Sequence, residues 1–219
     1  MEIENIIENY INKYTFNNKR SFISVGNIKR DFSMDNSNEK KMMINYILTG
    51  KCKYYIVPIT QKTTYNLVFD IDNSSKYNIK HQLSKDEFFK LIIGVILETL
   101  KNYFKDIDKF EYIVCTHTLN NYKYHITFPN IKVNCTQGCE INNLIINNEK
   151  LNFYYSMETL NHIIDQTLYK YTYMGLAFPY QEKTRGSGYY CIDPNLSTFD
   201  IAPYDIYKLM YMCSKKGTR

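Results

Sequence analysis

No apolar run in this sequence approaches the length of a membrane-spanning helix; the longest, residues 91–97, contains Gly94 and has polar flanks. The first residues, Met1-Glu2-Ile3-Glu4, lack the basic segment with which a secretory signal peptide begins. No internal repeat is visible, which argues against a repeat architecture. The six cysteines are irregularly spaced, which favours free thiols over a disulfide framework. These absences lead us to expect an intracellular globular protein.

The composition fits one domain with a small appendage. A chain of 219 residues can bury a sizeable core, and its content of 44% hydrophobic and 22% charged residues is ordinary for a globular protein. The 27 Lys and Arg against 22 Asp and Glu leave a net charge of +5, which is compatible with a nucleic-acid partner but does not prove one. The 22 tyrosines suit both base stacking and core packing, so they do not decide the function.

Hydrophobic periodicity predicts both helices and strands. Residues 1–20 place apolar side chains near one helical face, and Ser84 with Glu87 forms a capping box that opens a long amphipathic helix. Runs of β-prone residues predict four strands, at 53–59, 64–71, 110–116 and 122–129. A turn at 60–63 would join the first two strands as a hairpin. The Asn-rich residues 130–150 favour a loop, and 156–169 favour another helix that starts from a Ser cap.

This order of elements is typical of an α+β fold in which an RRM-like antiparallel sheet packs with helices on one face. We expect three parts along the chain. Residues 1–50 would form an N-terminal helical region that packs on the core, residues 51–210 the main domain, and residues 211–219 a linker or the end of a truncated piece.

Asp70 and Asp72 end the most informative stretch, the apolar and β-prone run that starts at Tyr65. In a strand, residues two apart point to the same face, so both carboxylates should project together from the strand end. Two like charges this close need a neutralising partner, and a divalent cation with oxygen ligands is the usual one. Paired carboxylates that hold two metals are typical of polymerase and nuclease sites. The alternative is a strand that runs into an Asp-Asn-Ser turn with both acids solvated.

Three further groups could join these carboxylates. Alternation along the strand 122–129 places Lys123 and His125 on one face, where a histidine can donate a hydrogen bond to a triphosphate oxygen or can be purely structural. Asp165 follows two apolar residues and is either a third metal ligand or an exposed acid on an amphipathic helix. Lys183 and Arg185 precede a Gly-Ser-Gly segment that either clamps phosphates or forms a solvated turn.

The order of these motifs resembles the archaeo-eukaryotic primase superfamily, and more closely the N-terminal primase domain of poxvirus-type and other large-DNA-virus primase–helicases. In that family the first motif is Asp-x-Asp, the second ends in His before an apolar strand and often a Pro, and the third is Ile-Asp followed four residues on by Tyr. A Lys and an Arg follow. The residues that match here are Asp70, Asp72, His125, Pro129, Ile164, Asp165, Tyr169, Lys183 and Arg185.

The resemblance runs from about residue 65 to residue 194 and includes two departures. The residue two before the motif His is usually small in the family, and here it is Lys123. The Leu-Arg pair that viral relatives usually carry after the third motif is absent from residues 173–177. Residues 51–210 would correspond to the primase catalytic domain.

The resemblance implies a DNA primase or primase-polymerase that begins short primers on single-stranded DNA during replication. It implies two Mg²⁺ or Mn²⁺ ions held by Asp70, Asp72 and Asp165. It assigns nucleotide binding to His125, Lys123, Lys183 and Arg185. The implied partners are a single-stranded DNA template, NTPs or dNTPs, and a hexameric helicase that is C-terminal or separate, with no membrane. For a viral protein the place of action would be the host cytoplasm or a viral factory.

Two other classes of protein stay open at this point. A replication-initiator endonuclease also uses an RRM-like sheet, a metal and a Tyr nucleophile, for which Tyr169, Tyr171 and Tyr173 are candidates. Such enzymes normally carry two histidines spaced by one residue on one strand, whereas here His117 and His125 are predicted on neighbouring strands. The other class is a non-catalytic domain that binds single-stranded nucleic acid.

A structural zinc site is the weakest of the metal hypotheses. Cys135 and Cys139 offer two thiols, but three intervening residues are only partly typical of zinc ligands. No second pair of cysteines follows at a suitable spacing. The sequence therefore favours free thiols at these positions.

Overall fold

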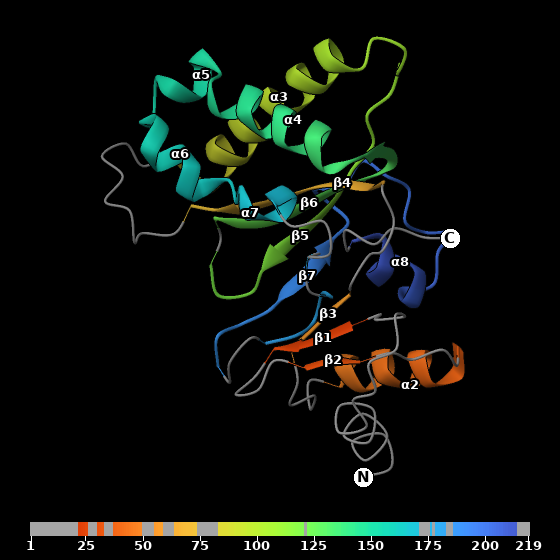
Figure 1. The fold of residues 1–219 in the computed structure, drawn as a ribbon. Coiled ribbons are helices and arrows are strands. Elements are labelled where there is room, and N and C mark those ends of the chain that lie inside the picture. The colour runs from red at the N-terminus through yellow and green to blue at the C-terminus, as the bar shows by residue number, and fades with distance from the viewer. Residues whose placement is uncertain are drawn as a thin grey trace.

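A computed structural model of the protein describes residues 22–25, 30–32, 37–49, 55–58, 64–73, 83–120, 122–170, 176, 178–182 and 186–213. In this part of the chain the fold is α+β, with two antiparallel sheets and with helices packed on the larger one (Figure 1). The predicted α+β class, with an antiparallel sheet packed with helices, is confirmed. No helix within the described ranges is long and apolar enough to cross a bilayer.

The smaller sheet lies near the N-terminus and has the order β2-β1-β3. Its strands are β1 (Phe22–Val25), β2 (Arg30–Phe32) and β3 (Tyr55–Pro58), with helix α2 (Ser37–Leu48) between β2 and β3 in the chain. The region over residues 1–50, which is predicted to be helical, contains α2 and also the two strands β1 and β2. The pairing of β1 with β3 also crosses the predicted boundary at residue 51. The helix predicted over residues 1–20 lies outside the described residues.

The larger sheet has the order β4-β6-β5-β7, and every neighbouring pair is antiparallel. Its strands are β4 (Tyr65–Asp72), β5 (Ile113–His117), β6 (Lys123–Val133) and β7 (Tyr190–Asp193). Among the described strands, β4 is therefore at the edge of its sheet and pairs with β6, while β3 pairs with β1. The predicted hairpin between the strands at 53–59 and 64–71 is wrong, because these strands belong to different sheets.

Helices cover one face of the larger sheet, above it in Figure 1. They are α3 (Lys85–Tyr103), α4 (Cys135–Ile146), α5 (Glu149–Asn152), α6 (Met157–Ile163) and α7 (Thr167–Lys170). The predicted capping box of α3 is confirmed, since the Ser84 hydroxyl accepts from the Glu87 N–H and the Glu87 carboxylate accepts from the Ser84 N–H. Such a cap stabilises a helix by about 1 kcal/mol.

Aromatic side chains form the centre of the core between α3 and the sheet. Phe69 and Phe128 on adjacent strands meet edge to face, with ring centroids 6.1 Å apart. Tyr124 lies 5.1 Å from Phe89 and 6.3 Å from Phe88 of α3. Burial of each such side chain stabilises the fold by roughly 1.5–3 kcal/mol, so this face anchors the sheet.

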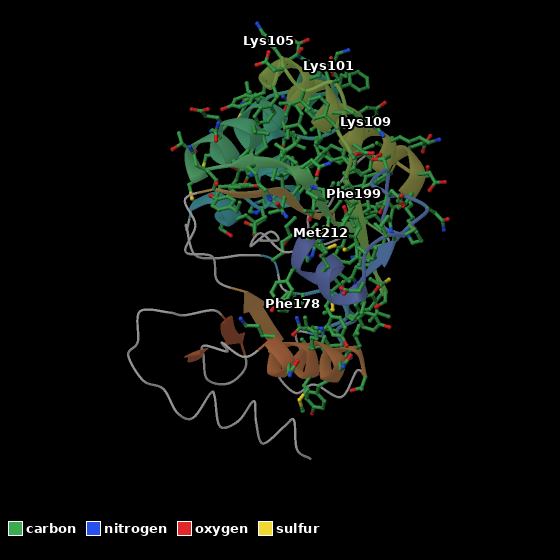
Figure 2. All side chains as sticks on the ribbon, turned by 90° about the vertical axis from the view of Figure 1, so that its right-hand side faces the viewer. Lys101, Lys105, Lys109, Phe178, Phe199 and Met212 are labelled. Atoms are coloured by element: carbon green, nitrogen blue, oxygen red, sulfur yellow. The ribbon has the colours of Figure 1, made fainter. Side chains whose placement is uncertain are left out.

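Helix α8 (Ile206–Met212) packs on the opposite face of the sheet but covers only part of it. A second apolar cluster lies there, in which Phe199 and Met212 pack with Cys115 of β5 (Figure 2). The Thr127 hydroxyl of β6 donates to the Cys213 carbonyl, 3.4 Å away. This packing includes Met212 and Cys213, which lie in the segment predicted as a linker or truncated end.

Two predicted elements differ from the structure for local reasons. Residues 130–150 are not a loop: β6 runs to Val133, and α4 begins after Asn134, whose side chain forms a capping box with Gln137. The helix expected over 156–169 is two short helices, α6 and α7, separated at Ile164, where the backbone is extended. Ile164 forms a single antiparallel bridge with Ile71, and this pairing interrupts the helix.

Candidate active site

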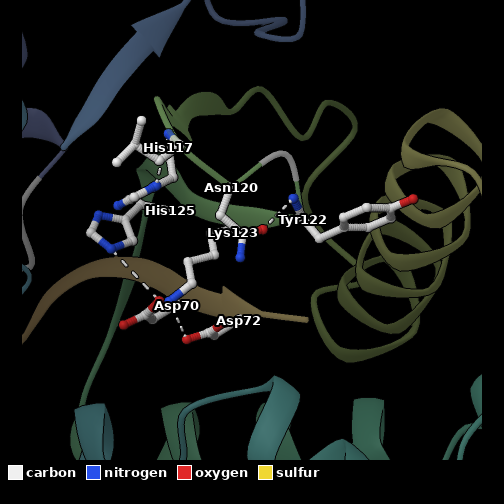
Figure 3. Close-up of polar contacts among 8 residues, drawn as sticks. Asp70, Asp72, His117, Asn120, Tyr122, Lys123 and His125 are labelled. Atoms are coloured by element: carbon white, nitrogen blue, oxygen red, sulfur yellow. Dashed lines mark hydrogen bonds and ion pairs between the residues drawn. The ribbon is translucent and has the colours of Figure 1, made fainter. Parts of the chain in front are cut away.

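The candidate residues of β4 and β6 meet on one face of the sheet, the face that α3 does not cover. Asp70 pairs in register with His125, and Asp72 pairs with Lys123 (Figure 3). Because alternate residues of a strand share a face, the four side chains form one polar group. Both carboxylates are partly open to solvent, with 27% of the Asp70 side chain and 37% of the Asp72 side chain exposed. The predicted convergence of Asp70, Asp72, Lys123 and His125 is thus seen in the fold.

Lys123 forms an ion pair with Asp72, in which Nζ lies 2.7 Å from Oδ2. The lysine side chain is 24% exposed, so water screens the pair and its net contribution to stability is small, at most about 1 kcal/mol. The ammonium group supplies positive charge at the end of β4. The charge of Asp72 is therefore balanced by a residue of the chain itself.

His125 is a buried and neutral member of the group. The residue is 4% exposed. Burial lowers the pKa of its imidazole to about 3, and electrostatic interactions with His117 and Lys123 act in the same direction. Its Nε2 lies 3.6 Å from Oδ1 of Asp70, which is beyond hydrogen-bond distance, so the contact is polar rather than a pair of full charges. The Tyr190 ring of β7 stacks on the imidazole, with centroids 3.5 Å apart and planes 21° from parallel.

Asp165 reaches the site through its backbone. Its N–H donates to the Asp70 carbonyl at 3.0 Å, next to the bridge between Ile71 and Ile164. The side chain has a different partner. Its Oδ1 accepts hydrogen bonds from the N–H and the hydroxyl of Thr167, at 2.8 and 2.7 Å, at the start of α7. The fold thus brings the third candidate acid beside β4 while its carboxylate caps a helix.

Tyr169 fastens the edge of β4 to the helical layer. Its hydroxyl donates to the Val68 carbonyl at 2.7 Å and accepts from the Val68 N–H at 2.8 Å, so one side chain satisfies both backbone groups of an edge residue. The ring is 1% exposed and lies against Gly138 of α4, where a Cβ would collide with it. Burial raises the pKa of the Tyr169 hydroxyl. This geometry suits a structural tie and leaves the hydroxyl poorly placed to act as a nucleophile.

The donor set fits hard divalent cations, since aspartate carboxylates are the oxygen ligands that Mg²⁺ and Mn²⁺ prefer. Asp70 and Asp72 are directed to one face, whereas the Asp165 carboxylate is bonded to Thr167. Among the described residues, no three His, Cys, Asp or Glu side chains are gathered closely enough to form a complete metal site. The described residues thus present two carboxylates, Asp70 and Asp72, on one face of the sheet.

The cysteines considered for zinc have other surroundings. Cys135 and Cys139 lie at the start of α4 and are not joined in a disulfide, and the Tyr65 hydroxyl donates to the Cys135 sulfur at 2.7 Å. Contact with a phenol is not a metal-ligand arrangement. The described part of the chain brings no additional His, Cys, Asp or Glu ligands together with these two thiols.

Lys183 and Arg185, the remaining nucleotide-binding candidates, lie outside the described residues, as do Tyr171 and Tyr173. The described segment that follows them returns to the site. Gly186 and Gly188 adopt positive φ angles of 76° and 75°, and Tyr189 donates its N–H to the Thr118 hydroxyl next to β5. The segment then enters β7, which carries Tyr190.

Sequence reasoning missed the part played by β7. Tyr190 reaches both His125 and His117, whose ring it meets edge-on with centroids 5.0 Å apart. Strand alternation could have grouped the two histidines, because His117 stands two residues after Cys115, the register partner of His125. No local signal pairs residues 190–193 with β5.

In comparisons with known proteins, no family model matches this chain and no curated protein matches it in sequence.

Proposed function

We propose that this chain is a DNA primase or primase-polymerase with an archaeo-eukaryotic primase core, which begins short primers on single-stranded DNA. One observation carries the proposal: two aspartates of a strand end share a face with a lysine and a neutral histidine of the next strand. The order of motifs in the sequence supports the same reading. The antiparallel sheet with helices on one face is compatible with it.

The chain's own residues would divide the work of nucleotidyl transfer. Asp70, Asp72 and Asp165 would hold two Mg²⁺ or Mn²⁺ ions. When bound, these ions would favour deprotonation of the attacking 3′-hydroxyl and offset the charge of the leaving pyrophosphate. His125, buried and neutral, would donate a ring N–H to a phosphate oxygen of the incoming NTP or dNTP.

Lys123 has two partners in this proposal. In the present structure it balances Asp72, and with a triphosphate bound it would turn to a phosphate oxygen. Since both its partners are anionic, the exchange keeps the lysine paired throughout. Lys183 and Arg185 are proposed to contribute further positive charge toward the triphosphate or the template, and a hexameric helicase is proposed as a partner in replication.

Primer synthesis without a pre-existing 3′ end tests the proposal directly. The assay would supply single-stranded DNA, labelled NTPs or dNTPs and Mn²⁺ or Mg²⁺, and would compare the wild type with Asp70→Asn. We expect short products from the wild type and none from the variant, with both proteins equally folded by circular dichroism. Products of equal yield from the variant would refute the assignment of Asp70.

A second candidate function is binding of single-stranded nucleic acid without catalysis. It is favoured by two observations: Lys123 already balances Asp72, and the Asp165 carboxylate already bonds Thr167 at the start of α7. DNA binding that is independent of divalent ions, in a protein that incorporates no nucleotide, would support this reading. An initiator endonuclease would need a tyrosine nucleophile. The Tyr169 hydroxyl is unfavourable for that role because it is buried and makes two hydrogen bonds with the backbone of Val68.

A further inference from the structure

A second histidine, His117, lies on the same face as the candidate carboxylates. It ends β5, and alternation from Cys115, which pairs with His125, directs both imidazoles to one side of the sheet. Figure 3 shows His117 beside His125, with Lys123 and the two aspartates below them. Burial lowers the pKa of His117, Lys123 lowers it further and Asp72 raises it, so all three side chains belong to one electrostatic group.

The hydrogen bonding of His117 defines where its proton is. The Leu119 N–H donates to Nδ1 at 3.3 Å, so Nδ1 carries no hydrogen. A neutral imidazole has one N–H, which then belongs to Nε2. Nε2 donates to none of the described residues, so its N–H is available as a donor on a side chain of the face that carries Asp72 and Lys123.

The ring of His117 is also held in place. Tyr190 meets it edge-on, at 79° between the planes. On another side Gly188, at φ +75°, lies so close that a Cβ would stand 2.7 Å from Cε1 of the imidazole. A ring packed in this way offers its Nε2–H in a defined direction, which is the property of a preorganised binding group.

We propose that His117 is a further substrate-contacting residue, whose Nε2–H donates to a phosphate oxygen of the incoming nucleoside triphosphate next to Lys123. The inference rests on the proposed function. A fixed N–H beside an ammonium group offers only donors and positive charge. A polyphosphate, which offers only acceptors and negative charge, is the complementary part of a nucleotide.

The test compares His117→Phe with the wild type. Phenylalanine keeps the ring and its contact with Tyr190 but has no donor. The binding of ATP and of dATP, each with Mn²⁺ and without template, is measured by calorimetry. We expect about tenfold weaker binding of the triphosphate, as for the loss of one hydrogen bond to a charged group. The nucleotide KM should rise by a similar factor and kcat should stay within about twofold.

Matched controls separate this role from a structural one. His162→Phe changes an exposed histidine of α6 and should leave triphosphate binding unchanged. His117→Gln keeps an amide donor and should restore part of the affinity. If His117→Phe does not fold, His117→Asn replaces it, because the amide of asparagine is too short to reach the Nε2 position.

Each outcome decides the matter. Unchanged triphosphate affinity in His117→Phe, in a wild type that makes primers, overturns the inference and leaves the proposed function standing. Weaker binding of single-stranded DNA, measured by fluorescence anisotropy, with unchanged triphosphate binding also overturns it, in favour of a template contact. A wild type that neither makes primers nor binds triphosphate refutes the function and the inference together.

Discussion

The two faces of the larger sheet differ although the same strands form both. On the face under α3, Phe69, Tyr124 and Phe128 interlock as a dry aromatic layer. On the other face, their immediate neighbours Asp70 and His125 meet as polar partners. Adjacent residues of one strand therefore lie on different faces, one in the packed core and the next in the polar group. We expect substitutions on the first face to cost stability and those on the second to cost binding and turnover.

The largest expected effect on the polar face is that of Asp70→Asn. The change keeps the size of the side chain but removes the charge that the proposed divalent cation would need, so under the proposed function primer synthesis should fall by about 10³-fold or more. The midpoint of thermal unfolding should move little, because the side chain is partly exposed. A variant that loses activity only in proportion to lost folded protein would contradict the division between the two faces.

On the covered face, Phe128→Ala should have the reverse signature. The side chain is fully buried between Phe69 and Tyr112, and its removal leaves a cavity that costs about 3–5 kcal/mol. Urea unfolding measures this loss. At a temperature where the variant is still folded, nucleotide binding per folded molecule should be close to that of the wild type. A loss of binding without a loss of folded protein would contradict the division of roles between the two faces.

The third prediction concerns Tyr169→Phe, at a residue that contacts the edge of β4. The substitution leaves the buried Val68 N–H and carbonyl without the phenol, which should cost about 1–3 kcal/mol of unfolding free energy. Tyr103→Phe is the matched control, since it removes an exposed bond to Glu140 and should cost much less. An equal loss of unfolding free energy in the two variants would mean that the hydrogen bonds of Tyr169 with Val68 do not add to stability.

The buried imidazole of His125 predicts a particular dependence of stability on pH. Its pKa is about 3 in the folded protein and near 6.5 in the unfolded chain, so between these values the unfolded state binds the extra proton. The contribution of the neutral imidazole to the free energy of unfolding is complete above pH 6.5. It is lost as the pH falls toward 3, with a slope of up to about 1.4 kcal/mol per pH unit.

The measurement is urea unfolding in EDTA across this range, for the wild type and His125→Gln. Other titrating groups act in both proteins, so the difference between the two slopes isolates the histidine. Parallel curves would show that the imidazole is not held neutral in the folded state.

The smallest expected effect concerns the ion pair of Lys123 with Asp72. In Lys123→Met, a divalent cation no longer competes with the ammonium group, so Mn²⁺ should bind a few-fold more tightly by calorimetry. The gain is limited because the pair is partly exposed. Lys150→Met breaks a comparable surface pair, with Glu98, and should leave Mn²⁺ affinity unaltered. Equal affinity in all three proteins would count against Asp72 as a ligand.

Local sequence signals predicted elements well where pattern and packing agree. The alternation through Asp70 and Asp72 predicted β4 and its polar end, and Ser84 with Glu87 predicted the start of α3. They failed where polar residues belong to a regular element. α4 is rich in Asn and Gln, yet Ile141 and Ile145, one helical turn apart, fix it to the core.

The sequence by itself determined the two-sided character of the strands, because alternation along a strand directs neighbours to opposite faces whatever the strand packs against. Only the tertiary structure decided which distant groups meet. Tyr169 and Val68 are 101 residues apart, and their contact, like that of Asp165 with Asp70, depends on how α6 and α7 lie along β4. The pairing of β7 with β5 likewise brings Tyr190 to both histidines. Such contacts follow from the packing of whole elements, which no local run of residues encodes.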